Sequence, residues 1–298
     1  MASNGKRYKG RLAAALGVAV VVLLVQVTGG VITGSLALLA DAGHLLTDVV
    51  GVGLALAAVT YANRPAPAHR TYGNFRVEIL AALVNGVLLL VVATFVVVQA
   101  VQRWYDPSEV EAGPMLAIAV FGLVGNLISL GLLHAGQAEN LNVRGAYLEV
   151  LGDLVGSAVV IVAALVIWTT GWLRADVVAS LLIAAFIIPR AIGLLRTTGH
   201  VLLESTPPGI DLDEIRRHIT ALPGVVDVHD LHVWTITSGM PVLSAHVVVE
   251  PSVLAEACDG SAVLDRLGHC LEADFDVEHC TFQLEPVTHA AHEHAAHE

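Results

Sequence analysis

A histidine and three carboxylates recur in pairs inside the most apolar part of this chain. The first pair is His44 and Asp48, within HLLTDVVG, and the second is Glu149 and Asp153, within EVLGDLVG, 105 residues later. Each pair has i, i+4 spacing, which places both side chains on one face of a helix. An ionisable side chain at the centre of a bilayer costs about 2.5 to 3.5 kcal/mol on insertion scales, so four of them need a function that repays this cost. One imidazole and three carboxylates are suitable ligands for a divalent cation.

Interhelical hydrogen bonding is the other explanation for such pairs. Apolar side chains would hold the helices together without the insertion penalty, so two matched pairs favour a cation site over a structural role. Asp41, three residues before His44, has two interpretations: a relay for cations near the helix start, or a structural group that faces a cavity between helices. We favour the structural role for Asp41.

The elements that must position these pairs are predicted membrane helices. Hydrophobic residues make up 55% of the 298 residues and charged residues only 14%, which indicates a polytopic membrane protein. A helix that crosses the hydrocarbon core needs about 20 mostly apolar residues. Six segments meet this requirement: 12–33, 36–61, 78–102, 114–134, 145–170 and 176–199.

The distribution of basic residues predicts the orientation of these spans. Lys6, Arg7, Lys9 and Arg11 precede the first span, and further arginines follow the second, precede the fifth and end the sixth. The opposite connections are poor in Lys and Arg, so the positive-inside rule places both termini in the cytoplasm. The first apolar run is too long for a signal peptide, so we expect it to remain as a membrane helix.

A change of composition after residue 199 predicts a second, soluble domain. Residues 1–199 carry 12 basic and 10 acidic residues, whereas residues 200–298 carry 3 basic and 17 acidic residues. An acidic domain repels nucleic acid and attracts cations, so nucleic acid is excluded as a partner. Helix and strand patterns follow in the order α-β-β-α-β over about 80 residues, which predicts a small two-layer, ferredoxin-like α/β domain.

We therefore expect three regions: a six-helix transmembrane domain in residues 1–203, a cytosolic α/β domain in residues 204–288, and a disordered tail in residues 289–298. The tail is rich in histidine, and such tracts bind Zn²⁺, Ni²⁺ or Cu²⁺ weakly, although an inert end is an equal alternative. The three cysteines lie in the soluble part without CxxC spacing, which indicates reduced intracellular thiols.

Four stretches of the sequence are distinctive: SLALLADAGHLLTDVVG, YGNFRVEILAALVNGVLLL, AENLNVRGAYLEVLGDLVGS, and VHDLHVWTITSG with the following LSAHVVVE. Together they resemble the cation diffusion facilitator family, the proton-coupled transporters of zinc and other heavy metals, over residues 12 to 287. In that family the second helix supplies an HxxxD or DxxxD pair and the fifth an HxxxD pair. His44, Asp48 and Asp153 match this pattern, so the resemblance implies that they belong to the transport site.

Glu149 departs from the family pattern, because the usual zinc-transporting member has histidine at this position. A carboxylate makes the site harder and more negative, which by ligand preference admits Mn²⁺, Fe²⁺ or Co²⁺. Cd²⁺ is a further alternative. We still expect Zn²⁺ first, because His44 remains and tetrahedral sites of nitrogen and oxygen ligands suit zinc.

The resemblance implies antiport, with metal exported from the cytoplasm across a bacterial inner membrane in exchange for protons. Site chemistry makes this reasonable, because metal ligands must be deprotonated and protons therefore compete with the metal. The sequence contains no GxxxxGK[ST] phosphate loop, so ATP is not the expected energy source. We expect no organic cofactor.

For the soluble domain, the resemblance implies a homodimer that binds further metal. His232, His246 and Glu285 match positions used in the family, and His279 lies near another. Six residues of strand separate His279 from Glu285, roughly 20 Å at about 3.3 Å per residue. We therefore group His232, His246 and Glu285, and leave His279, with Cys280 as a candidate partner, for a separate or intersubunit site. Ordinary surface histidines are the alternative.

Two other classes of protein are alternatives to a transporter. A membrane metalloenzyme would use His44 and Glu149 to activate water, but the sequence has no HExxH motif, so we expect no enzyme activity. A metal sensor would use the spans only as an anchor and would not need ionisable pairs in two of them. The sequence therefore predicts a divalent-metal exporter first and a membrane-anchored sensor as the alternative class.

Overall fold

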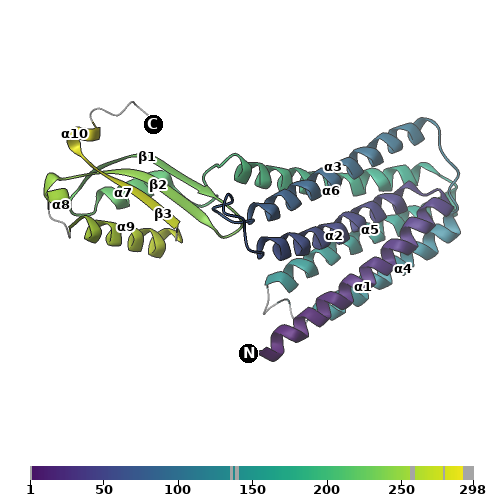
Figure 1. Cartoon of the computed structure of the whole chain (residues 1–298). Coiled ribbons are helices and arrows are strands. Elements are labelled where there is room, and N and C mark those ends of the chain that lie inside the picture. Colours follow the sequence, from purple (N-terminus) through teal and green to yellow (C-terminus); the bar gives the residue numbers. More distant parts are fainter. Residues whose placement is uncertain (1, 135–136, 138–140, 256–258, 278, 291–298) are drawn as a thin grey trace. The chain divides into compact units, whose positions relative to one another are not determined.

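The computed structural model describes residues 2–134, 137, 141–255, 259–277 and 279–290. Six helices in its first part are long and apolar enough to cross a membrane, which confirms the expected architecture (Figure 1). Most extend a few residues past the predicted spans, because polar end residues continue the helical hydrogen bonding. The helices are α1 (Ala2–Thr33), α2 (Leu36–Ala62), α3 (Arg76–Tyr105), α4 (Ala112–His134), α5 (Leu141–Thr170) and α6 (Arg174–Leu202).

The start of α2 is held by a side chain from α6. Asp176 is almost fully buried, and its carboxylate accepts a hydrogen bond from Ser35 Oγ at 2.6 Å. It also accepts hydrogen bonds from the backbone N–H groups of Leu36, at 2.8 Å, and Ala37, at 3.1 Å. The first N–H groups of a helix have no partner within the helix, and an anion there complements the helix dipole. Asp176 therefore fixes the helix that carries His44 and Asp48 against α6.

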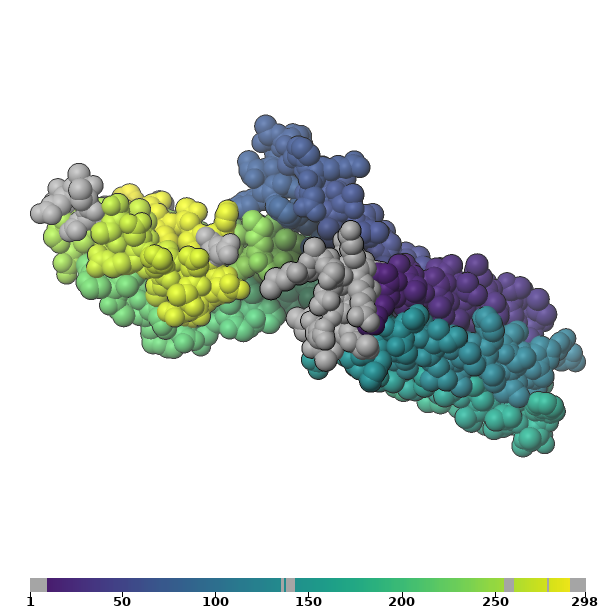
Figure 2. Space-filling view, turned by 90° about the horizontal axis from the view of Figure 1, so that it is seen from below, coloured from purple at the N-terminus to yellow at the C-terminus, as the bar shows by residue number. Residues whose placement is uncertain are grey.

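Small residues bring α1, α4 and α5 close together. In the space-filling view, α1 (purple) lies directly against α4 (teal) (Figure 2). At this contact Gly125 faces Val22, and a Cβ atom on the glycine would clash with the valine side chain. Small residues allow membrane helices to approach closely, since no hydrophobic force drives their association in lipid.

An apolar cluster lies toward one end of the helical bundle. It is built mainly from the first half of α2, α4 and α6 and from the middle and second half of α3 and α5. Because successive spans alternate in direction, these halves all lie on the membrane side opposite the N-terminus. Its buried members include Leu38, Leu89, Met115, Ala164 and Ile187.

The second compact unit contains residues 58–80 and 196–298. Its elements are α7 (Leu212–Thr220), β1 (Val225–Thr235), β2 (Pro241–Val249), α8 (Pro251–Ala255), α9 (Asp259–Phe275), β3 (His279–Pro286) and α10 (Val287–Ala290). The strand order is β1-β2-β3, with β1 antiparallel and β3 parallel to β2 (Figure 1). The expected α-β-β-α-β order is confirmed, with the short helices α8 and α10 added. Residues 289 and 290 belong to α10, and positions 291–298 of the expected tail lie outside the described residues.

The sheet buries one face against α7 and α9. Leu243, Ala245 and Val247 alternate along β2 and pack with Ile215 of α7 and Leu267 of α9. Because successive side chains of a strand point to opposite faces, the residues between them lie on the face away from these helices. His246 is one of them.

Candidate metal centres

Two side chains of α2 and one of α5 converge within the helical bundle. His44 Nε2 lies 3.9 Å from Asp48 Oδ2 and 3.8 Å from Asp153 Oδ1. One ligand atom from each residue lies within 4.8 Å of the others. Asp153 is buried, and the other two are mostly so. We call His44, Asp48 and Asp153 the intramembrane trio.

The separations within the intramembrane trio suit a divalent cation. Zn–N and Zn–O bonds of about 2.0 to 2.2 Å place tetrahedral ligand atoms roughly 3.3 to 3.6 Å apart. The two separations from His44 exceed this range by about half an ångström or less. Both carboxylate oxygens of Asp48 are buried and accept no hydrogen bond from the described residues. Buried polar atoms normally have hydrogen-bond partners, whereas these oxygens form ion pairs with His44 and with Arg190 of α6, which is an environment suited to a bound cation.

Glu149, the fourth residue of the expected site, does not join the intramembrane trio. Its carboxylate accepts a hydrogen bond from Arg190 Nη2 of α6 at 2.7 Å, and its side chain is 45% exposed. The same Nη2 atom lies 3.1 Å from Asp48 Oδ1. The structure thus brings together three of the four expected residues and adds Arg190, which the sequence interpretation missed.

A cavity of about 260 Å³ reaches the intramembrane trio. Asp48, Glu149 and Asp153 form its polar part, and apolar side chains of α1, α2, α4 and α5 form the rest. These lining residues belong to the first half of α1 and α5, the second half of α4, and the middle of α2. By the alternation of the spans, the cavity lies toward the membrane side of the N-terminus, opposite the apolar cluster.

A layer of hydrogen-bonded polar groups lies on the other side of the intramembrane trio. Asp41 of α2 accepts hydrogen bonds from Gln26 Nε2 at 2.6 Å and from Ser157 Oγ at 3.4 Å. Asn126 donates in turn to Ser157 Oγ at 3.3 Å. All four residues are buried. These contacts join α1, α2, α4 and α5 and favour the structural role for Asp41.

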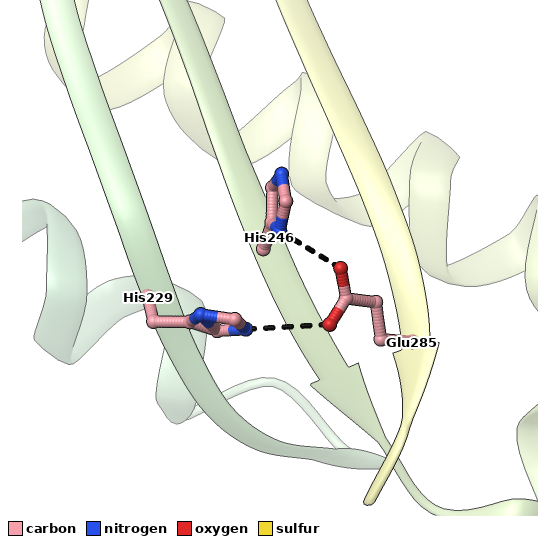
Figure 3. A group of neighbouring side chains, drawn as sticks. All are labelled: His229, His246 and Glu285. Atoms are coloured by element: carbon pink, nitrogen blue, oxygen red, sulfur yellow. Dashed lines mark ion pairs between the residues drawn. The ribbon is translucent and has the colours of Figure 1, made fainter. Parts of the chain in front are cut away.

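A second trio lies on the sheet of the second compact unit (Figure 3). His246 Nδ1 is 2.8 Å from Glu285 Oε1, and His229 Nε2 is 3.3 Å from Glu285 Oε2. Each residue comes from a different strand, and Glu285 is only 2% exposed. A buried carboxylate is costly unless a cation or hydrogen bonds compensate it, and two imidazoles with one carboxylate match the ligand types of zinc sites. We call His229, His246 and Glu285 the cytosolic trio.

The cytosolic trio contains His229 where we expected His232. His229 is the direct strand partner of His246, whereas His232 lies opposite Ser244, and its Nε2 atom is 3.2 Å from Asp230 Oδ1. The strand register is shifted between His229 and His232, and Asp230 within this irregularity has a φ of 50°. An extra residue in one strand breaks the alternation of side chains, so this local geometry decides which histidine joins the trio.

His279 lies away from the cytosolic trio, as its distance from Glu285 along the strand requires. It is exposed at the start of β3 and lines a separate hollow of about 240 Å³ together with Asp276. Cys280, its proposed partner, packs toward the core of the domain instead. Burial also raises the pKa of the Cys280 thiol to about 11. Adjacent residues of a strand point to opposite faces, so His279 and Cys280 do not lie on the same face of β3.

Two protein-family models match the chain along most of its length. The model described as the cation efflux transmembrane domain matches residues 12–203, which carry the intramembrane trio. The model described as the cation efflux protein cytoplasmic domain matches residues 207–287, which carry the cytosolic trio.

Curated relatives cover most of the chain. The metal cation efflux system protein CzcD of Cupriavidus metallidurans is 45% identical over 88% of this chain and 82% of its own length. The zinc transporter ZitB of Escherichia coli is 44% identical over 92% and 87%. A cadmium, cobalt and zinc/H(+)-K(+) antiporter of Bacillus subtilis is 38% identical over 90% and 86%. A solved metal-bound C-terminal domain of CzcD is 41% identical over 26% of this chain and 99% of that chain, with a TM-score of 0.23.

Proposed function

The chain belongs to the cation efflux family, and from that premise we propose that it exports Zn²⁺ in exchange for protons. Membership makes it an integral membrane protein and a metal cation efflux transporter. The choice of zinc and the coupling to protons are our proposal. The observation that carries it is the intramembrane trio, His44, Asp48 and Asp153, with its one nitrogen and two carboxylate ligands.

Proton coupling is supported by the ligand types of the intramembrane trio. A metal binds only to deprotonated carboxylates and neutral imidazole, so loading a protonated site releases protons and protonation releases metal. Histidine has an unperturbed pKa of about 6.5, which makes it a group that changes charge near neutral pH. Alternating exposure of such a site to the two sides of a membrane gives antiport. The B. subtilis relative is named as a zinc/H(+)-K(+) antiporter, and the proton in this name supports the coupling.

The cargo is a soft or borderline divalent ion. ZitB is named for zinc, and the B. subtilis relative for cadmium, cobalt and zinc, so Cd²⁺ and Co²⁺ are natural alternatives. We expected Mn²⁺, Fe²⁺ or Co²⁺ as alternatives because Glu149 replaces the usual histidine, and Mn²⁺ and Fe²⁺ are the harder ions among them. Because Glu149 is hydrogen-bonded to Arg190, the structure gives these harder ions less support than Zn²⁺.

We further propose that the chain works as a homodimer in a bacterial inner membrane with both termini in the cytoplasm. The cytoplasmic-domain match and the acidic composition after residue 199 support a cytosolic C-terminal region. On this proposal residues 1–203 carry the cargo, residues 204–288 dimerise and bind regulatory or structural metal at the cytosolic trio, and residues 289–298 are a histidine-rich tail.

Metal-driven proton flux in proteoliposomes tests the proposed function. The full chain would be reconstituted with a pH-sensitive dye inside, and Zn²⁺, Cd²⁺, Co²⁺, Mn²⁺ and Fe²⁺ would be added one at a time. Asp48→Asn removes a ligand of the intramembrane trio, so we expect zinc-driven flux to fall to the level of empty liposomes. Asp265→Asn is the matched control, because this carboxylate is exposed on α9 and should leave flux unchanged.

The outcomes separate the proposals. Zinc-driven flux that depends on Asp48 supports the antiporter, and flux driven instead by Mn²⁺ or Fe²⁺ would replace the cargo but keep the mechanism. If no ion drives a flux that depends on Asp48, the antiporter is wrong and the membrane-anchored sensor becomes the function to test.

A further inference from the structure

A permanent positive charge lies inside the candidate transport site. Arg190 of α6 places one guanidinium nitrogen, Nη2, 2.7 Å from Glu149 Oε1 and 3.1 Å from Asp48 Oδ1. Its side chain is 38% exposed, while the Asp48 side chain is only 12% exposed. An arginine is charged at all physiological pH values, so it acts on a metal site as a fixed cation. A site for cations that contains its own cation needs an explanation.

The two contacts of Arg190 are not equivalent. The guanidinium donates a hydrogen bond to Glu149, whereas no hydrogen bond joins it to Asp48, whose oxygens accept none from the described residues. Arg190 is thus held by a hydrogen bond to Glu149, whereas its contact with Asp48 is an ion pair without a hydrogen bond. Rotation of the guanidinium away from Asp48 would leave the Glu149 pair intact and free a ligand of the intramembrane trio.

The charges of the group match a divalent ion. With all groups ionised, Asp48, Asp153 and Glu149 contribute three negative charges and Arg190 one positive charge, which leaves two. A divalent cation would then make the loaded group neutral. Burial of net charge is costly in a low-dielectric interior, so neutrality favours movement of the loaded site through the bundle.

We propose that Arg190 is an internal counter-ion that occupies the place of the metal at Asp48 in the unloaded site, and that Glu149 is its anchor rather than a ligand. This inference rests on the proposed function. A metal ion that binds must displace Arg190 from Asp48. When Arg190 returns to Asp48, it helps to release the metal ion. Arg190 therefore weakens metal binding and speeds metal release, and Glu149 limits the competition by holding the guanidinium to one side.

An anchor role and a ligand role for Glu149 predict different metal affinities in a double-mutant cycle of Glu149 and Arg190. If Glu149 is a ligand, Glu149→Gln weakens metal binding by the same factor whether or not Arg190 is present. If Glu149 is an anchor, the substitution releases Arg190 onto Asp48 and weakens binding only while Arg190 is present. Coupling between the two residues therefore decides the role of Glu149.

The experiment measures Zn²⁺ binding by titration calorimetry on the purified full chain in detergent. His229→Ala and His246→Ala are present throughout, so that the cytosolic trio does not contribute. On this background the parent, Glu149→Gln, Arg190→Gln and the double variant are compared. We expect Glu149→Gln to raise Kd about 10-fold and Arg190→Gln to lower it about 10-fold. The double variant should match Arg190→Gln within about twofold.

A second variant and a second measurement keep the test interpretable if Arg190→Gln disturbs the fold. Arg190→Lys keeps the charge and should bind Zn²⁺ with nearly the parent Kd, which a merely structural role for the arginine would not predict. In proteoliposomes, Arg190→Gln should turn over more slowly than the parent although it binds more tightly, because release is slowed.

The inference is overturned if Arg190→Gln fails to tighten binding, or if Glu149→Gln weakens it equally in both backgrounds. If either result is obtained while Zn²⁺ binding by the parent still depends on Asp48, the proposed function is unaffected. A parent whose binding does not depend on Asp48 would instead remove the proposed function, and this inference with it.

Discussion

The two trios differ in charge at the level of single residues. The intramembrane trio has two carboxylates and one imidazole, whereas the cytosolic trio has one carboxylate and two imidazoles. Fewer negative charges and more nitrogen ligands favour zinc over harder ions. By ligand type, the cytosolic trio is therefore the better suited of the two to select zinc. Under our proposal it holds a resident metal and the intramembrane trio binds the cargo.

Substitution of His229 or His232 tests the cytosolic trio. We expect His229→Ala to weaken zinc binding by at least about 100-fold, because even groups behind the metal ligands commonly contribute 10- to 100-fold. His232→Ala, three residues away in the same strand, is the matched control and should change Kd by less than about threefold. Both variants would be titrated with Zn²⁺ on an Asp48→Asn background, which silences the intramembrane trio. A larger loss from His232→Ala would restore our original grouping.

Sequence spacing could predict some of these residues and not others. The i, i+4 rule places His44 and Asp48 on one face without any tertiary information, and the matching pair on α5 indicated Asp153. The partner of Glu149 lies 41 residues away on another span, and no local pattern connects the two. His229 was missed because the irregular register at Asp230 breaks the strand alternation on which such an assignment depends.

At the scale of elements, one carboxylate holds the start of α2. Asp176→Asn would keep the size of the side chain but remove its negative charge. Ser35 Oγ and the backbone N–H groups of Leu36 and Ala37 now donate hydrogen bonds to this carboxylate. We expect a loss of about 1 to 3 kcal/mol in unfolding free energy, as for buried charge-assisted hydrogen bonds. Thermal unfolding in detergent measures it, with the exposed Asp265→Asn as the control. An unchanged midpoint would show that Asp176 does not fix α2.

The crossing of α2 and α5 depends on a glycine. A Cβ atom on Gly156 would lie 2.6 Å from Asp41 Oδ1, whereas a Cβ on Gly152, one turn earlier on α5, meets nothing within 4 Å. We expect Gly156→Ala to disrupt the Asp41 hydrogen bonds and reduce metal-driven flux several-fold. Gly152→Ala should leave flux near the parent value. Equal effects from the two substitutions would contradict a special role for this crossing.

The existence of the elements was more predictable than their contacts. Six apolar segments of about 20 residues can hardly form anything but membrane helices, and the strand alternation of the soluble part was equally clear. The network that links Gln26, Asp41, Asn126 and Ser157 joins four different helices, so it depends on how the helices pack. The sequence analysis identified Asp41 but could not identify its hydrogen-bond partners.

For the membrane unit as a whole, the surroundings of the intramembrane trio differ between the two ends of the bundle. The cavity lies toward the end of the N-terminus, while the apolar cluster and the Asp41 layer lie toward the opposite end. A single site that is exposed to one side at a time is the requirement of alternating access. On our proposed orientation of the termini, a cavity at this end is what we expect of the state that loads metal from the cytoplasm.

Cysteine labelling tests this conformation on two positions of one helix. Cys258, Cys270 and Cys280 would first be replaced by serine, and then Ala146→Cys in the cavity compared with Ala164→Cys in the apolar cluster. A membrane-impermeant maleimide should label position 146 from the N-terminal side at least about 10-fold faster than position 164, because thiol reaction needs access and ionisation. Addition of Zn²⁺ should slow labelling at 146, since an ion bound by Asp48 and Asp153 lies at the end of the same cavity. Faster labelling at 164, from the opposite side, would mean that the resting transporter faces the other way.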